Sequence, residues 1–280
     1  MDRVLPLQGK SREFESHYLH NMKKIVIASL LSLFLLSFSI VGNSPVRTVE
    51  NRAYKAGEVL NYRIHYGVIS AGVVSMEVGT KVIDGKTTYH LKVEGETLKS
   101  FDWAYKVRDK FESWIDITSQ LPIRYSKVVR ENKYFDEDIA IYNHSEKWLR
   151  NPKGKLNITQ YTQDLPSAIY YLRTIDYSKD VVGSQHYFDV YLDNKVYKLS
   201  LKYDGKETLK TDIGTIKCIK LKPQLIVDRV FKESDAMTIW VSDDENKIPI
   251  RISSEIYVGS IKVDITKTQN LKNPMTSQIK

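Results

Sequence analysis

Apolar and polar residues alternate along most of the chain from residue 58 onward. In "EVLNYRIHY" every second residue after Val59 is apolar, and "VVSMEVGTKV" and "TTYHLKVEG" repeat the pattern, over residues 58–66, 73–82 and 87–95. Alternation with a period of two predicts antiparallel strands that have one face in the core and one face in water. An Asp-Gly pair occurs within residues 83–87 and again within residues 202–207. Because Asp-Gly favours tight two-residue turns, each pair predicts a hairpin.

One segment has a helical period instead. In "DLPSAIYYLRTIDY" (164–177) the apolar side chains recur every three or four residues, which predicts a helix with one apolar face. Asp164 can accept hydrogen bonds at its N-terminus, and Pro166 fits the first turn. We expect this helix to cover the sheet.

The helix separates two halves that resemble each other. The first half contains "ESWIDITSQLPIRYS" (112–126) and the second contains "TIWVSDDENKIPIRIS" (238–253). Both copies predict a strand, a polar turn and a returning strand that begins with Pro-Ile-Arg. We therefore expect an all-β, antiparallel fold in which two similar halves form an open or half-closed barrel or curved sheet. The expected boundaries are one domain over 50–268, with halves of about 53–150 and 180–268, and a polar tail over 269–280.

The repeat also explains a cluster of three acids, Asp243, Asp244 and Glu245. The first copy has no acids at the matching turn, and the spacing does not fit a calcium loop. We interpret the cluster as a hairpin turn with solvated acids. A second acidic run, Asp136 to Asp138, predicts another hairpin tip.

The N-terminal part of the chain predicts export. Lys23 and Lys24 precede an apolar run over 25–41, the pattern of a secretory signal. We expect residues 22–42 to be a signal peptide, with translation starting at Met22 and residues 1–21 a mis-assigned leader. The alternative is an uncleaved inner-membrane anchor formed by residues 25–41, which are just long enough to span a bilayer.

Composition and motifs exclude several classes. The net charge of +8 is spread thinly, with no basic block that would indicate nucleic-acid binding. A single cysteine, Cys218, leaves no internal disulfide and no thiolate zinc site. The sequence contains no metal-binding His spacing, no nucleophile elbow and no phosphate-binding loop. We expect no catalytic residues, no metal and no cofactor, and so no enzyme.

Aromatic residues point instead to binding. Several large rings lie on strand faces that the simple alternation would leave in water, and they need a cover. Ordinary core packing is one explanation, and a bound apolar ligand is the other. The candidates for lining such a ligand site are Trp103, Trp114, Tyr170 and Trp240.

Four stretches together resemble one family. "YKAGEVLNYRIHYGVISAGVVSMEV", "DLPSAIYYLR", "GTIKCIKLKP" and "IWVSDDENKIPIRIS" are similar to the exported bacterial family called domain of unknown function 3108 (DUF3108), over about residues 53–267. The resemblance implies an antiparallel β protein of the Gram-negative envelope, and it supplies no catalytic residues. We expect structural roles for the residues of these motifs and of the repeat: Gly57, Glu58, Tyr62, Pro122, Arg124, Arg173, Pro249 and Arg251.

From the sequence we therefore expect an exported, periplasmic and non-enzymatic scaffold. Its expected partner is an apolar or lipid-like component of the envelope, or an envelope protein. It would contact the membrane only through its signal or anchor segment. The alternative is an envelope hydrolase or glycan-active enzyme that uses carboxylates scattered over the strands.

Overall fold

The computed structural model describes residues 47–227, 230–232, 237–256 and 259–279. The chain divides into two compact units, Met1–Pro45 and Val46–Lys280, and all described residues belong to the second unit. The expected leader, signal and anchor segments lie outside the described residues. Among the described residues, no helix has the length and hydropathy needed to cross a membrane.

Strands dominate the described part of the chain, as the alternation predicted. Sixteen strands and one helix are present there: β1 (Val59–Tyr66), β2 (Ile69–Ile83), β3 (Lys86–Thr97), β4 (Arg108–Asp116), β5 (Pro122–Glu131), β6 (Tyr134–Asn143), β7 (Trp148–Asn151), β8 (Gly154–Asn157), α2 (Leu165–Leu172), β9 (Gln185–Leu192), β10 (Lys195–Thr211), β11 (Gly214–Val227), β12 (Val230–Lys232), β13 (Met237–Ser242), β14 (Pro249–Glu255), β15 (Ser260–Gln269) and β16 (Gln278–Ile279).

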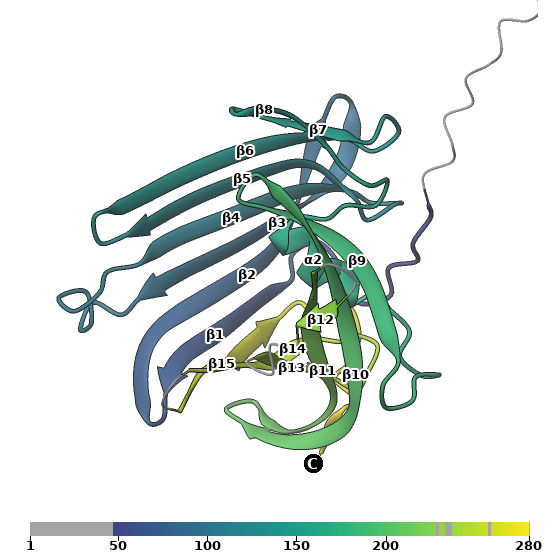
Figure 1. The fold of residues 1–280 in the computed structure, drawn as a ribbon. Coiled ribbons are helices and arrows are strands. Elements are labelled where there is room, and N and C mark those ends of the chain that lie inside the picture. The colour runs from purple at the N-terminus through teal and green to yellow at the C-terminus, as the bar shows by residue number, and fades with distance from the viewer. Residues whose placement is uncertain (1–46, 228–229, 233–236, 257–258, 280) are drawn as a thin grey trace, which may run out of the picture. The chain divides into compact units, whose positions relative to one another are not determined.

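All sixteen strands belong to one antiparallel sheet. Its hydrogen-bonded order runs β8-β7-β6-β5-β4-β3-β2-β1-β15-β14-β13-β11-β10-β9, and the short strands β12 and β16 pair with β11. The two ends of this order do not meet, so the sheet is not closed. The expectation of an all-β antiparallel fold with one helix and an open sheet is confirmed (Figure 1).

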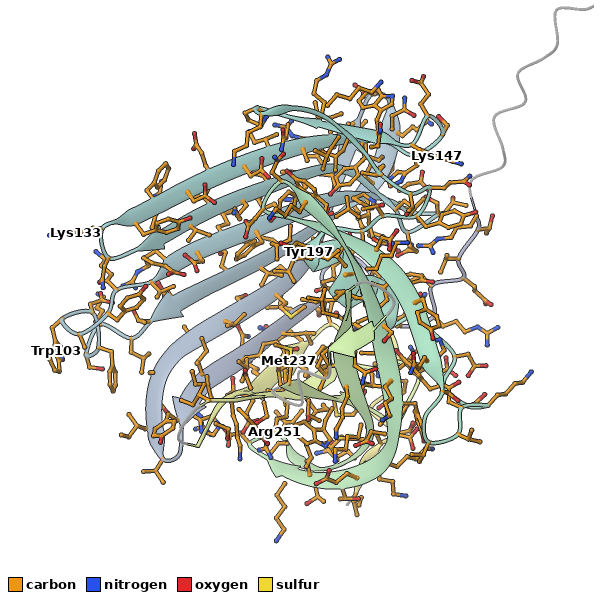
Figure 2. All side chains as sticks on the ribbon, viewed as in Figure 1. Trp103, Lys133, Lys147, Tyr197, Met237 and Arg251 are labelled. Carbon is orange, nitrogen blue, oxygen red and sulfur yellow. The ribbon has the colours of Figure 1, made fainter. Side chains whose placement is uncertain are left out.

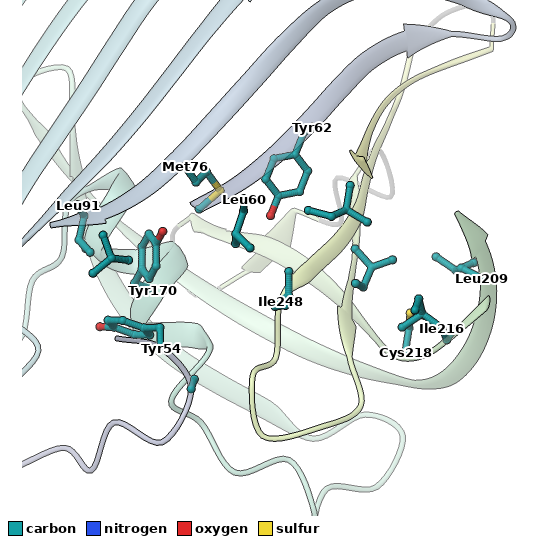
Figure 3. Close-up of a cluster of buried hydrophobic side chains, with 14 of the residues drawn as sticks. Tyr54, Leu60, Tyr62, Met76, Leu91, Tyr170, Leu209, Ile216, Cys218 and Ile248 are labelled. Atoms are coloured by element: carbon teal, nitrogen blue, oxygen red, sulfur yellow. The ribbon is translucent and has the colours of Figure 1, made fainter. Parts of the chain in front are cut away.

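The helix packs between strands of both halves. Tyr170 of α2 belongs to the largest apolar cluster, together with Leu91 and Ile115 of the first half (Figure 3). Leu172, at the other end of α2, packs on a cluster built from β10, β11 and β13 of the second half. The short helix therefore packs against apolar clusters of both halves of the sheet.

Helix α2 begins where the sequence predicted and ends earlier. The Asp164 side chain accepts a hydrogen bond from the Ser167 backbone N–H, the Ser167 hydroxyl accepts one from the Asp164 N–H, and Pro166 stands in the first turn. Arg173 is the C-terminal cap, so the helix is five residues shorter than the expected end at Tyr177. The chain after it continues in tighter turns, in which the Thr174 N–H donates to the Tyr171 carbonyl at 2.9 Å.

One of the two Asp-Gly hairpins forms and the other does not. Asp84 and Gly85 both have positive φ (49° and 76°) and make the turn between β2 and β3. Asp204 and Gly205 lie inside β10, at a break in the register with β11, so that prediction was wrong. Gly205 has φ of 92°, and one extra residue of β10 is accommodated here as a bulge, while pairing continues on both sides.

One further local expectation was wrong, and one strand had no sequence signal. Asp136 to Asp138 lie within β6, and the hairpin tip is formed by Asn132 and Lys133 instead. The polar stretch after Asn151 contains the short hairpin strand β8, which no alternation predicted. In both places the neighbouring strand sets the register, and local composition does not reveal it.

Candidate functional site

The most deeply buried ion pair of the described residues joins Glu58 and Arg173. Arg173 Nη1 donates to Glu58 Oε1 at 2.5 Å and Nη2 donates to Oε2 at 2.9 Å, in a bidentate arrangement. The side chains are 0% and 1% exposed. The guanidinium also donates to two backbone carbonyls, of Asn246 (3.0 Å) and Ala53 (3.4 Å). Nearly every polar atom of the pair is therefore satisfied inside the protein.

Tyrosine rings surround the guanidinium. The centroids of Tyr54 and Tyr170 lie 5.3 Å and 5.1 Å from its central carbon, and the two rings meet edge to face at 4.8 Å. Burial opposes the charged form of Arg173, but the Glu58 carboxylate outweighs burial and raises the pKa of Arg173 above its ordinary value. The guanidinium is consequently held in its charged form, so Arg173 acts as a brace and not as a proton donor.

The two copies of the repeat are built alike. Trp114 faces Arg124 across β4 and β5, and Trp240 faces Arg251 across β13 and β14. In each hairpin the register shifts immediately after the Trp, so that the next residue pairs with the Pro that begins the returning strand, Pro122 or Pro249. The sequence similarity therefore corresponds to one repeated hairpin geometry.

Both repeated turns reach the region of helix α2. Gln120, in the first turn, accepts a hydrogen bond from the Tyr54 hydroxyl and, through its backbone carbonyl, one from the Gln163 side chain. Asn246, in the second turn, gives its carbonyl to Arg173. The first turn thus docks before the start of the helix and the second at its end. The brace joins the helix, β1 and the second repeated turn.

The acidic turn of the second copy also has internal partners. Asp244 accepts hydrogen bonds from the Ser242 hydroxyl (2.9 Å), the Asn246 backbone N–H (3.0 Å) and the Ser277 hydroxyl (2.6 Å). The cluster is a turn, as we interpreted it, but Asp244 also fastens the C-terminal segment and is not simply solvated. In the described residues, no group of three or more His, Cys, Asp or Glu side chains is arranged to hold a metal ion.

Two buried groups have shifted pKa values without a reactive setting. Burial raises the pKa of Asp164 to about 7, against the opposing effect of hydrogen bonds from Ser167 and from the Ser113 hydroxyl. Burial also raises the pKa of the Cys218 thiol to about 12, and the side chain is fully covered. A thiol with a raised pKa is a poor nucleophile, so we interpret Cys218 as a small buried hydrophobic side chain.

A cavity of about 600 Å³ lies against strands β1 to β5. In the strand register, most residues that line this cavity form three neighbouring rows that run across the strands, each row made of residues paired with one another. Gly95 lies in the middle row. The lining mixes valines with charged side chains of both signs: Asn61, Tyr62, Val73, Val74, Ser75, Glu94, Gly95, Glu96, Arg108, Asp109, Lys110, Arg130 and Thr266. A smaller apolar cavity of about 30 Å³ lies under α2, beside Leu172 and Val241.

The structure does not bring the four candidate ligand-lining aromatics together. Trp103 stands on the β3–β4 loop and is 85% exposed, whereas Tyr170 is completely buried beside Arg173. Trp114 stacks on His90 at 4.7 Å, and the indole N–H of Trp240 donates to Glu207. None of the four is among the residues that line the 600 Å³ cavity.

The other motif residues have structural positions. Gly57 adopts φ of 89° in the turn before β1, and its N–H donates to the Val78 carbonyl at 2.7 Å. Tyr62 is buried on β1. Arg251 binds Asp264 in a bidentate pair at 2.5 and 2.7 Å, and His65 approaches the same carboxylate at 3.0 Å.

Sequence reasoning missed the cavity and part of the buried centre. Tyr54 contacts this centre but was not among the site candidates. An isolated glycine within an alternating strand indicates a bulge or an open space, so Gly95 was the available signal for the cavity. No periodic pattern pointed to Lys127, which is buried and binds Asp136 and Asp193, both at 2.5 Å.

Comparison with solved structures supports the fold alone. A beta-barrel-like protein of domain of unknown function DUF1849 from Brucella abortus superposes with a TM-score of 0.50 at 11% identity, covering 80% of this chain and 98% of that one. A protein with a YmcC-like fold from Bacteroides fragilis, named as a candidate exported protein, gives a TM-score of 0.37 at 8% identity, covering 80% and 100%. The second value is too low to carry an argument.

No curated protein matches the sequence. A family model does: the protein family of unknown function DUF3108 matches residues 61–266, which is most of the chain and spans β1 to β15. The match includes Arg173, both repeated hairpins and all of the cavity lining. The chain therefore belongs to the DUF3108 family.

Proposed function

We propose that this protein is exported to the periplasm, where it acts without catalysis by binding an amphipathic component of the cell envelope in the 600 Å³ cavity. The cavity is the observation that carries the proposal. Its volume is in the range of small-molecule sites, which is about 300–1,000 Å³. Valines beside charged side chains suit a molecule with both apolar and polar parts. The signal-like segment over 22–42 supports export.

The buried centre supports a non-catalytic role. Glu58 and Arg173 are almost completely covered, and their polar atoms already bond to each other and to backbone carbonyls. A substrate would have to unfold the centre to reach them. The most polar part of the interior thus stabilises the scaffold, and the cavity on β1–β5 is left as the binding element.

The test is native mass spectrometry of protein purified from envelopes, followed by delipidation and rebinding. Val74 pairs with Gly95, and Ser75 pairs with Glu94, so Ser75 and Gly95 project to opposite faces of β2 and β3. Ser75→Trp and Gly95→Trp therefore place an indole on each face of the sheet beside the cavity. We expect the indole that projects into the cavity to fill it and abolish ligand binding. A wild type without ligand, or two variants that both retain it, would contradict the proposal.

One observation favours the alternative of a glycan-active enzyme. Asp109 lines the cavity, and burial followed by the nearby Glu131 charge raises its pKa, although the Arg130 backbone N–H opposes the shift. A raised carboxyl pKa beside a second acid is typical of glycosidase sites. If the wild type releases sugar from envelope glycan and Asp109→Asn abolishes this release, the enzyme proposal replaces the binding proposal.

A further inference from the structure

Three hairpin connections gather at one end of the first half of the sheet. The connections β1–β2, β3–β4 and β5–β6 join successive antiparallel strands at the same end (Figure 1). Trp103 and Lys133 mark two of these tips in Figure 2, both at the far end of the strands. We call this the aromatic end and define it as residues 67–69, 98–107 and 132–135.

The aromatic end exposes large apolar side chains. Val68 is fully exposed and Trp103 is 85% exposed, and about half of the surface of Tyr105, Tyr134 and Phe135 is in contact with water. The turns at the opposite end of the same strands have polar sequences: Asp-Gly at 84–85, Thr-Ser-Gln at 118–120 and Ser-Glu-Lys at 145–147. Exposed rings that are concentrated on one set of tips indicate an interaction surface.

The loop that carries Trp103 is braced. Arg108 binds Asp102 through two hydrogen bonds, at 3.1 and 2.7 Å, and the Thr97 hydroxyl donates to the same carboxylate at 2.8 Å. Asn132, on the neighbouring tip, accepts from the Lys106 backbone N–H at 2.8 Å and donates its own N–H to the Lys106 carbonyl at 2.8 Å. The exposed indole therefore projects from a fixed support.

The surroundings of these rings carry more positive than negative charge, although the Glu131 carboxylate borders them and accepts a hydrogen bond from the Tyr105 hydroxyl at 2.9 Å. Lys99, Lys106 and Lys133 are exposed on the same tips, and among the described residues no carboxylate lies within salt-bridge distance of them. The one acid of the β3–β4 loop, Asp102, is already neutralised by Arg108. Positive charge beside exposed Trp and Tyr rings complements a surface that is negatively charged outside and apolar beneath.

We propose that the aromatic end docks on a lipid bilayer that contains anionic phospholipid. Trp and Tyr rings concentrate at the level of lipid headgroups, where the ring is in the apolar layer and its polar atom remains hydrated. Lysines near the surface are attracted to anionic headgroups. Trp103, Val68 and Phe135 enter the interface, and Lys99, Lys106 and Lys133 contact the headgroups.

This docking goes beyond binding in the cavity and rests on separate observations. It also places the cavity close to the bilayer, because Val73, Arg108 and Arg130 lie within five residues of the tips. An amphipathic molecule could then exchange between membrane and cavity over a short path.

The experiment is tryptophan quenching by vesicles with brominated acyl chains, using the full chain. None of the four tryptophans lies in residues 1–46, so an inserted N-terminal segment adds no signal. We expect brominated phosphatidylglycerol vesicles to quench the wild type and brominated phosphatidylcholine vesicles to quench it at least about tenfold less efficiently. Trp103→Phe should remove most of the quenching, and the matched control Trp148→Phe should retain it, since Trp148 lies on β7, away from these tips.

A second variant tests the charges. Lys106→Glu with Lys133→Glu should lower quenching by phosphatidylglycerol vesicles to the level seen with phosphatidylcholine. Trp103, Lys106 and Lys133 are exposed and Trp148 is half-buried, so the variants should fold like the wild type, which circular dichroism can verify. Three results would each overturn the proposal: equal quenching of wild type and Trp103→Phe, equal quenching by both lipids, or no quenching of the wild type.

Discussion

Removing the positive charge from the buried brace should cost a large part of the stability. Arg173→Met keeps the apolar stem and most of the volume of the side chain but deletes all of its donors. Glu58 then loses hydrogen bonds of 2.5 and 2.9 Å, and the carbonyl of Asn246 loses one of 3.0 Å. The carboxylate remains buried, with no counter-charge in contact with it.

The expected cost is about 3–5 kcal/mol, which is typical when one partner of a buried ion pair is removed. Domains of this kind have about 5–15 kcal/mol of total stability, so Arg173→Met would lose between a fifth of it and all of it. The double variant Glu58→Met with Arg173→Met removes both charges. Because no unpaired charge then remains, it should be more stable than Arg173→Met alone.

The assay is urea unfolding at pH 7, followed by tryptophan fluorescence and by circular dichroism. Arg52→Met is the matched control, since Arg52 pairs with Glu50 at 2.8 Å but both side chains are mostly exposed. Exposed ion pairs of this kind contribute little to stability, because solvent and salt screen the charges. If Arg173→Met shifts the unfolding free energy no more than Arg52→Met, the pair does not brace the fold and our reasoning is refuted.

Two further outcomes test the interior. The pKa of Asp164 is about 7 in the folded chain and lower in the unfolded chain, so the protonated carboxyl stabilises the fold at pH 4 and this stabilisation is lost as the pH rises through 7. Urea unfolding at pH 5 and pH 8 should show the loss in the wild type and not in Asp164→Asn. An equal loss in both proteins would exclude Asp164 as its source. A Cβ on Gly72 would lie 2.6 Å from the Glu96 carbonyl oxygen, whereas a Cβ on Gly79 would have its nearest neighbour at 3.7 Å. In urea unfolding, Gly72→Ala should therefore lower the unfolding free energy by roughly 1–3 kcal/mol and Gly79→Ala by no more than about 0.5 kcal/mol. Equal effects of the two variants would contradict the close approach at Gly72.

The sequence was sufficient for local structure where a pattern repeats without interruption. Alternation located β1, β2 and β3, and the helical stripe after Asp164 located α2. Asp84–Gly85 formed its turn because the strands on both sides pair with each other. Asp204–Gly205 carries the same signal, but its flanks continue along β11, and this pairing overrides the local preference.

The buried centre could be predicted only in part. Glu58 and Arg173 were both selected as motif residues, yet no spacing or period indicates that two residues 115 positions apart form a pair. Their contact depends on how the sheet folds around the helix, which is a property of the whole chain. The aromatic end was hidden for the same reason, because Val68, Trp103 and Phe135 come from three separate hairpins.

The sheet order has a consequence for how the chain acquires its structure. Strand β1 hydrogen-bonds β15, and this pairing joins Val59 to Gln269. During synthesis or passage through a membrane, the first strand has one free edge until almost the last residues are available. Contacts between such distant parts of a chain form slowly, and exposed strand edges invite aggregation. We therefore expect a shortened chain that ends before Ser260 to require a chaperone, even though most of its strands would be intact.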